Sequence, residues 1–262
     1  MLKKRLIAVI IIRDGTVVQS VRFKHTNVIH SDPIHAIETF SRWSVDEIVL
    51  LDVSRGKPAE DTFVELVDRT ARRCFVPLSI GGWITDDEKA DRLLKAGADK
   101  LVLNTAFEDD PELVQRLSKR YGQQCIVASI DAKCTEDGKQ YIAVDRARRI
   151  VEHGPADWAE RVVGLGAGEI FLNSVEHDGA RRGYNLPILK DVSERVSVPV
   201  IAFGGVMFWK HLADGYKSGA SAVAAANIFH YKEHATRSAK TYLAEEGFEI
   251  RNEGRSFRPG NR

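Results

Sequence analysis

The chain has 262 residues, and its 38 lysines and arginines nearly balance its 37 aspartates and glutamates. Because the formal net charge is only +1, no overall field attracts the chain to nucleic acid or to an anionic membrane, and any anion site has to be local. The three cysteines lack metal-ligand spacing, and no segment resembles a signal peptide or a membrane span of roughly 20 apolar residues. We therefore expect a globular cytoplasmic protein without a metal or other cofactor.

Eight short apolar runs follow one another along the chain, separated mostly by longer segments of helical pattern. They are LIAVIII (6–12), EIVLLDV (47–53), VPLSIGG (76–82), KLVLNTA (100–106), CIVASID (125–131), EIFLNSV (169–175), VPVIAFGG (198–205) and AVAAANIF (222–229). The first run leads into a turn at Asp14-Gly15. Alternating strands and helices indicate a parallel sheet, which eight strands most simply close into a (β/α)₈ TIM barrel. An open doubly wound sheet is the alternative.

The second four runs repeat features of the first four. Glu47-Ile48 recurs at Glu169-Ile170, and Val76-Pro77 recurs at Val198-Pro199, both 122 residues later. This internal repeat predicts one barrel over residues 1–251, with half-barrels at about 1–122 and 123–251. The polar segment 252–262 (NEGRSFRPGNR) is expected to be a flexible C-terminal tail.

Glycine pairs end two of the runs, at Gly81-Gly82 and Gly204-Gly205, and small or polar residues end the run that follows each pair. Backbone N–H groups exposed by glycine bind phosphate oxygens, especially beside a helix N-terminus. Glycines at strand ends are also ordinary turn residues. Their occurrence at matched positions of both halves favours two phosphate sites.

The runs given above, together with KRLIAVIIIRDGTVV and GAGEIFLNSVEHDG, resemble HisF, the cyclase subunit of imidazole glycerol phosphate synthase, over roughly residues 1–250. The resemblance implies a barrel that receives ammonia from a HisH-like glutaminase docked at its N-terminal face. The ammonia then crosses the barrel to a bis-phosphate ribonucleotide. The resemblance is greatest to the AglZ/HisF-like paralogues that take part in acetamidino modification of surface polysaccharides.

The resemblance places one of the family's two catalytic aspartates at Asp131, whereas the other position is occupied by Ile11. An alkyl group cannot transfer a proton, and removing a positioned acid or base costs about 10²- to 10⁴-fold in rate. The family pattern is also altered at Gln19, Trp83, Asn173 and Asn227. The positions that correspond to phosphate or substrate contacts are Gly82, Asn104, Thr105, Asp178, Gly179, Gly205, Ala226 and Asn227.

Four charged residues correspond to the gate through which ammonia enters the family's barrel: Arg5, Glu47, Lys100 and Glu169. Strand alternation sends every second residue to one face, so these residues share the inward face with Val9, Val49, Val102, Val127 and Phe171. Charges turned into a barrel cost several kcal/mol each unless they are well paired. Asp99 corresponds to the edge that faces the glutaminase. The alternative is that these residues form ordinary salt bridges at strand starts.

Three functions therefore remain. The first is an ammonia-channelling subunit that works with a HisH-like glutaminase and an ATP-dependent N-acetyl-sugar amidotransferase. The second is a true cyclase of histidine biosynthesis, and the third is a noncatalytic scaffold that docks a glutaminase. His25 and His30, expected in a loop after the first strand, and His177 are weaker candidates for ligand contact.

Overall fold

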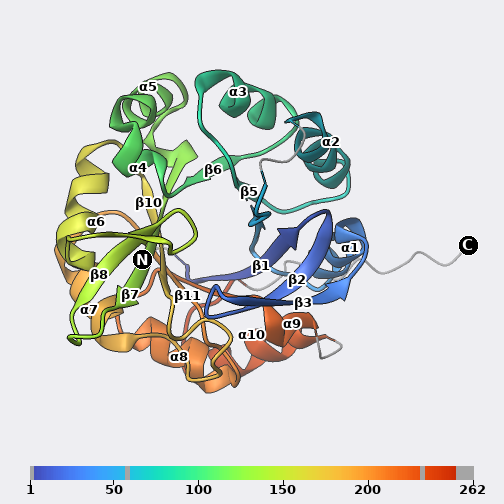
Figure 1. Ribbon diagram of the computed structural model, residues 1–262. Helices are drawn as coiled ribbons and strands as arrows, with labels where there is room; N and C mark the ends of the chain where they lie inside the picture. The colour runs from blue at the N-terminus through green and yellow to red at the C-terminus, as the bar shows by residue number, and fades with distance from the viewer. Residues whose placement is uncertain (1–2, 57–59, 231–233, 252–262) are drawn as a thin grey trace, which may run out of the picture.

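The computed structural model describes residues 3–56, 60–230 and 234–251, and its centre is a closed ring of parallel strands (Figure 1). The strands of the ring are β1 (Arg5–Arg13), β4 (Glu47–Asp52), β5 (Leu78–Gly81), β6 (Lys100–Leu103), β7 (Ile126–Cys134), β10 (Glu169–Ser174), β11 (Val200–Phe203) and β12 (Ala222–Ala225). Each strand pairs with the next in parallel, and β12 pairs with β1. The pairing of β10 with β7 completes the ring. The predicted (β/α)₈ barrel is confirmed, and the open sheet is wrong.

Helices surround the ring on its outer side (Figure 1). They are α1 (Pro33–Arg42), α2 (Glu60–Ala71), α3 (Asp87–Lys95), α4 (Ala106–Asp109), α5 (Pro111–Tyr121), α6 (Pro155–Gly164), α7 (Leu186–Arg195), α8 (Trp209–Lys217), α9 (Asn227–His230) and α10 (Ala235–Glu245), with a 3₁₀ turn at Gln123–Cys125. Aspartate side chains cap α1, α3 and α5, where Asp32, Asp86 and Asp110 accept backbone N–H groups of the first turn. Proline follows the cap in α1 and α5, as its fixed φ favours.

Side chains of β1 alternate between two separate apolar clusters. Leu6, Ala8 and Ile10 pack in the layer between the strands and the helices. Ile7, Val9 and Ile11 belong to a second cluster inside the ring, which we call the axial column. Its other buried members are Val18, Val49, Val102, Val127, Phe171, Ile201, Phe203, Ala222 and Ala224. The axial column separates the two ends of the barrel.

Two β-hairpins, which the sequence analysis did not predict, follow the first and fifth strands of the ring. The first is β2 (Thr16–Val21) with β3 (His25–His30), and the second is β8 (Gln140–Val144) with β9 (Arg149–Val151). His25 and His30 therefore begin and end a strand, and their expected place in a loop is wrong. The predicted turn at Asp14-Gly15 is confirmed, because β1 pairs with β2 across it. Both hairpins lie at the C-terminal end of the ring (Figure 1), which we call the mouth.

Candidate functional site

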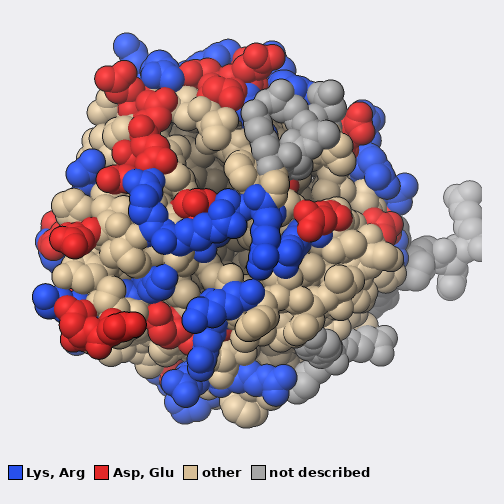
Figure 2. All heavy atoms as spheres, viewed as in Figure 1, with Lys and Arg blue, Asp and Glu red and all other residues tan. Residues whose placement is uncertain are grey.

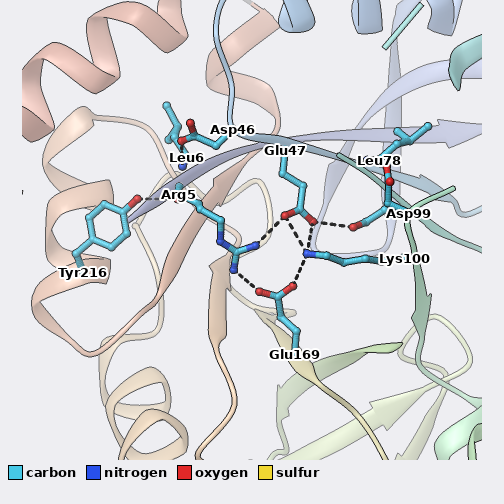
Figure 3. Close-up of polar contacts among 10 residues, drawn as sticks. Arg5, Leu6, Asp46, Glu47, Leu78, Asp99, Lys100, Glu169 and Tyr216 are labelled. Atoms are coloured by element: carbon cyan, nitrogen blue, oxygen red, sulfur yellow. Dashed lines mark hydrogen bonds and ion pairs between the residues drawn. The ribbon is translucent and has the colours of Figure 1, made fainter. Parts of the chain in front are cut away.

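Four charged residues form a ring at the N-terminal end of the barrel, which we call the floor. Arg5, Glu47, Lys100 and Glu169 are each the first residue of a strand, so the barrel brings their side chains to one level. Figure 3 shows that their charged ends point toward one another. Arg5 Nη1 lies 2.8 Å from Glu47 Oε2, and Arg5 Nη2 contacts Glu169. Lys100 Nζ lies 3.0 Å from Glu47 Oε2 and 2.8 Å from Glu169 Oε2. Each cation thus contacts both anions.

The carboxylates of this ring are more deeply buried than its cations. The side chains of Glu47 and Glu169 are 3% and 7% exposed, whereas those of Arg5 and Lys100 are 21% and 19% exposed. Ser79 Oγ also donates to Glu47 Oε1 over 2.7 Å. Burial alone would lower the pKa of Arg5, but attraction by Glu169 and Glu47 outweighs it and raises this pKa. The ring is therefore a paired, electrically neutral set of charges in which the two carboxylates are buried.

A second charged pair supports the floor from outside the ring. Asp46 is buried; its Oδ2 accepts the Leu6 N–H at 2.7 Å and its Oδ1 lies 2.7 Å from Lys240 Nζ. The sequence analysis missed this pair because no repeat or spacing in the sequence relates position 46 to position 240. Asp99 is exposed at the same end of the barrel, and its carboxylate accepts the Leu78 N–H at 2.8 Å. Asp99 thus lies beside the ring and does not belong to it.

The axial column contains all five residues that were expected to line the axis. Val9, Val49, Val102, Val127 and Phe171 are at most 5% exposed. The ring centroids of Phe171 and Phe203 are 4.8 Å apart. Above the charged floor, the inside of the barrel is thus lined mainly by apolar side chains, with Ser129 of β7 on the same face as Val127.

Asp131 and Ile11 mark the upper end of the axial column. Ile11 is 6% exposed and packs within the column, while Asp131 is 8% exposed. Asn104 Nδ2 lies 3.3 Å from Asp131 Oδ2. Burial, with a smaller effect of the Asp178 charge, raises the pKa of Asp131 to about 7, although a hydrogen bond from Asn173 opposes the rise. The mouth therefore keeps one carboxyl group that can hold or release a proton near neutral pH.

Neither of the other aspartates near the first two strand ends replaces the missing carboxylate. The side chain of Asp14 is 70% exposed, and its backbone N–H donates to Ser54 Oγ. Asp52 Oδ1 accepts both the backbone N–H and the hydroxyl of Ser54, at 2.9 and 2.6 Å. Both residues organise the turn after β4.

The candidate phosphate residues of the first half lie under the β8–β9 hairpin. Thr105 Oγ1 accepts the Asp145 N–H at 3.0 Å and donates to Asn104 Oδ1 at 3.3 Å. Gly82 has φ +130°, and a β-carbon there would lie 2.8 Å from the Asp52 carbonyl oxygen. Only glycine therefore fits at position 82.

The candidate residues of the second half are divided between a turn and a strand end. Asp178 Oδ2 accepts the Ser20 hydroxyl at 2.6 Å and the Phe23 N–H at 3.3 Å, so it holds the tip of the β2–β3 hairpin. Gly179 and Gly205 have positive φ values of +63° and +83°. Ala226 and Asn227 follow β12, and Asn227 Oδ1 is buried without a hydrogen-bond partner. His177 contacts the Gly183 carbonyl oxygen through Nδ1 at 2.7 Å.

A band of lysine and arginine side chains crosses the mouth in Figure 2. The strand ends, hairpins and loops at this end supply Arg13, Arg22, Lys24, Arg55, Lys133 and Arg146. The sequence analysis missed this band because the overall charge is close to zero. Clustering in space can produce a local field that net charge does not reveal.

Within 3–56, 60–230 and 234–251, no three histidine, cysteine, aspartate or glutamate side chains are grouped so that they could hold a metal ion. In the same ranges, every helix is too short or too polar to cross a membrane. The expected flexible tail, 252–262, lies outside these ranges.

Comparison with known proteins assigns the family. The model of the family described as "Histidine biosynthesis protein" matches residues 5–235. A curated protein of Vibrio vulnificus (strain YJ016), named "Putative imidazole glycerol phosphate synthase subunit hisF2", is 42% identical over 253 residues, which cover 96% of this chain and 92% of the relative. The matched region includes the floor, the axial column and the strand ends of the mouth. The chain belongs to the HisF family of histidine biosynthesis proteins.

Proposed function

We propose that this protein is the ammonia-channelling subunit of a glutamine-dependent amidotransferase complex. The observation that carries the proposal is the contrast between the two ends of the barrel. At the floor, Arg5, Glu47, Lys100 and Glu169 form a complete ring of alternating charge. At the mouth, Asp131 corresponds to one of the family's two catalytic positions, and the other is occupied by Ile11, whose side chain continues the apolar column.

The partner at the floor is a HisH-like glutaminase, which releases ammonia from glutamine. Lys100 is the member of the ring best suited to move, because a lysine side chain is long and its ammonium group is a compact point charge. Ammonia then passes through the axial column as neutral NH₃. Apolar walls disfavour NH₄⁺, since burying an unpaired ion costs far more than burying a small neutral molecule.

At the mouth, ammonia is transferred to a substrate that another protein activates. An ATP-dependent N-acetyl-sugar amidotransferase is the partner that fits this scheme, and acetamidino-sugar synthesis for surface polysaccharides is the corresponding pathway. The support is the family resemblance together with Ile11 at the first catalytic position. A barrel that only delivers ammonia has no need for the second proton-transfer group.

A cyclase activity in histidine biosynthesis is the second candidate, and two observations favour it. The Vibrio relative is named as a subunit of imidazole glycerol phosphate synthase. Asp131 also has its pKa raised to about 7, which suits a general acid or base. Against a cyclase, the Asp52 carboxylate accepts two bonds from Ser54, and the Asp14 carboxylate is exposed and paired with Arg13. A scaffold that docks a glutaminase without passing ammonia is the third candidate.

Isotope transfer separates a barrel that channels ammonia from a scaffold, and complementation separates the cyclase from a barrel that only conducts ammonia. The reconstituted complex receives glutamine labelled with ¹⁵N in its amide group, together with an excess of unlabelled ammonium. A channel predicts product that retains most of the ¹⁵N label, whereas a scaffold predicts dilution to the label content of bulk ammonium. Rescue of a histidine auxotroph lacking HisF by the wild-type gene would show cyclase activity and contradict a barrel that only conducts ammonia.

A further inference from the structure

Arg146, in the turn between β8 and β9, joins this hairpin to the opposite side of the mouth. Its Nη1 atom lies 2.8 Å from the Ser54 carbonyl oxygen and 3.0 Å from that of Arg55. Its guanidinium carbon lies 4.9 Å from the centre of the Trp83 ring. These contacts connect the loops that follow β7, β4 and β5. We call Arg146 and Trp83, with the contacts they make, the clamp.

The clamp uses nearly all of the binding capacity of Arg146. A guanidinium has five N–H donors. Besides the two bonds to carbonyl oxygens, Nε and Nη2 donate to Asp145 Oδ1 at 3.3 and 2.9 Å. Four of the five donors are thus occupied within the chain, and the indole of Trp83 lies against the group. Arg146 is therefore placed to hold the hairpin down, and little of it is left to bind a phosphate.

The same hairpin engages the first-half phosphate residues. Asp145 donates its backbone N–H to Thr105 Oγ1, and the Thr105 hydroxyl donates to Asn104 Oδ1. Asn104 Nδ2 in turn lies 3.0 Å from the Ser129 carbonyl oxygen. The hydroxyl and the amide that would contact a phosphate thus bind groups of this chain.

Backbone geometry indicates that these contacts hold the turn in place. Asp145, Arg146 and Ala147 have φ values of 49°, 57° and 59°, and Trp83 has 54°. Residues other than glycine rarely adopt positive φ, and such conformations persist where surrounding contacts enforce them. Three successive residues of this kind, none of them glycine, make a turn that depends on the clamp.

The second half of the mouth keeps unused hydrogen-bonding capacity. Asn173 Oδ1 and Asn227 Oδ1 are buried without a partner. Gly204 and Gly205, at φ +96° and +83°, keep the backbone turn expected of a phosphate site. A buried acceptor without a donor is costly, so a ligand with hydroxyl or amino groups would satisfy it.

We infer that the clamp closes the first-half phosphate site and leaves the second-half site open. The mouth therefore accepts ligands with a single phosphate group and excludes bis-phosphates. Such a ligand binds at the strand ends of β10 to β12. The inference rests on the proposed function in one respect: both take the mouth not to carry out the cyclisation reaction. The test below needs neither glutaminase nor ammonia, so it can fail independently of the channel.

The experiment is a titration with inorganic phosphate. ³¹P NMR measures the number of phosphate ions bound, and the indole N–H signal of Trp83 reports whether phosphate binds beside this residue. The proteins are the wild type, Arg146→Ala, Trp83→Gly, and the double variant Arg146→Ala with Thr105→Val. Arg148→Ala is the matched control, because Arg148 belongs to the same turn, its side chain is 54% exposed, and it contributes only a distant contact to Asp145.

We expect Arg146→Ala and Trp83→Gly each to gain one phosphate site relative to the wild type. In Arg146→Ala, phosphate shifts the Trp83 indole signal, and adding Thr105→Val removes the extra site. Arg148→Ala keeps the wild-type stoichiometry. Losing a cation normally weakens anion binding, so a gain in Arg146→Ala has to come from opening the site.

Weaker phosphate binding by Arg146→Ala would identify Arg146 as a phosphate ligand and overturn the inference. An unchanged stoichiometry in both clamp variants would overturn it as well. If Arg146→Ala does not fold, Trp83→Gly provides the test of the inference. This variant should fold, because glycine readily adopts the positive φ of position 83.

Discussion

Lys100 Nζ lies 2.8 Å from Glu169 Oε2 and 3.0 Å from Glu47 Oε2, so one ammonium group joins two buried carboxylates. Replacing Lys100 with methionine removes the cation but retains an apolar chain of similar length. Because the carboxylates keep only Arg5, we expect the free energy of unfolding to fall by about 1–3 kcal/mol. We also expect glutamine hydrolysis to lose its coupling to product formation in the reconstituted complex.

The measurements are urea denaturation and the ratio of glutamate released to product formed. Lys95→Met is the control, because the Lys95 side chain is 79% exposed and its ion pair with Asp91 is worth at most about 1 kcal/mol. Unchanged coupling in Lys100→Met would remove the argument for a gate.

Ile11→Asp restores the family's second carboxyl group at the mouth. We expect this variant, like the wild type, not to support growth of a histidine auxotroph lacking HisF. The reason is that the clamp still closes the first-half phosphate site. Because the new carboxyl group enters the axial column, the free energy of unfolding should fall by roughly 2–4 kcal/mol. Ile11→Val, which costs about 1 kcal/mol, is the control for packing. Growth restored by Ile11→Asp alone would show that the mouth still binds the cyclase substrate.

Asp131→Asn should change the dependence of stability on pH. Burial and the charge of Asp178 raise the pKa of Asp131 from 3.8 to about 7. Between pH 4 and 7 the folded protein keeps a proton that the unfolded chain releases, so this group makes the protein less stable as pH rises, and its full cost is present above pH 7. The asparagine variant lacks this titration. We expect its stability relative to the wild type to increase by roughly 2–4 kcal/mol between pH 4 and 8.

Urea denaturation at several pH values measures this difference. Glu136→Gln, which replaces an exposed carboxylate in the turn from β7 to β8 by an amide, is the control. Parallel stability curves for Asp131→Asn and the wild type would mean that Asp131 has the same pKa in the folded and unfolded states.

Asp178→Ala should loosen the tip of the β2–β3 hairpin. The variant loses the acceptor for Ser20 Oγ and for the Phe23 N–H, although the Asp178 backbone oxygen still accepts the Arg22 N–H. Hydrogen exchange of residues 17–28 should become faster, since local opening then breaks fewer contacts. Exchange in the outer helices should not change. Asp191→Ala, an exposed aspartate of α7, serves as the comparison. Equal hydrogen-exchange rates of residues 17–28 in both variants would show that the Asp178 side chain does not hold the hairpin tip.

Phe75 is 87% exposed in the loop before β5, at the same end of the barrel as the charged ring. An exposed aromatic residue of this kind is a strong candidate for a binding hot spot. We expect Phe75→Asp to weaken glutaminase binding by about 1–2 kcal/mol, or at least several-fold in Kd, without lowering the melting temperature. Val28→Asp, at a 68% exposed position of β3 near the mouth, is the control. Calorimetric titration with the glutaminase would show equal affinities if Phe75 lay outside the interface.

Much of the barrel could be predicted because short-range patterns determine it. Strand alternation placed Val9 and Ile11 inside the ring, and both lie in the axial column. The charged ring was also anticipated, but only through the family resemblance, since nothing in the spacing of Arg5 and Glu169 indicates that they meet.

The hairpins and the clamp were not predicted, for a physical reason. Arg146 contacts the Ser54 carbonyl oxygen across 92 residues of sequence, and no periodicity records such a contact. The turn at Asp145 to Ala147 lacks the glycine or asparagine that usually indicates positive φ. A turn held by long-range contacts cannot be recognised from its own residues.

The alternating order of charges at the floor lets one cation leave the ring without removing the counter-ion of either carboxylate. Arg5 contacts both Glu47 and Glu169 without help from Lys100. A rotation of the lysine away from the axis therefore leaves neither acid stranded without a counter-ion. Rotation of this one side chain thus breaks two of the four ion pairs of the ring while the backbone of all eight strands stays still.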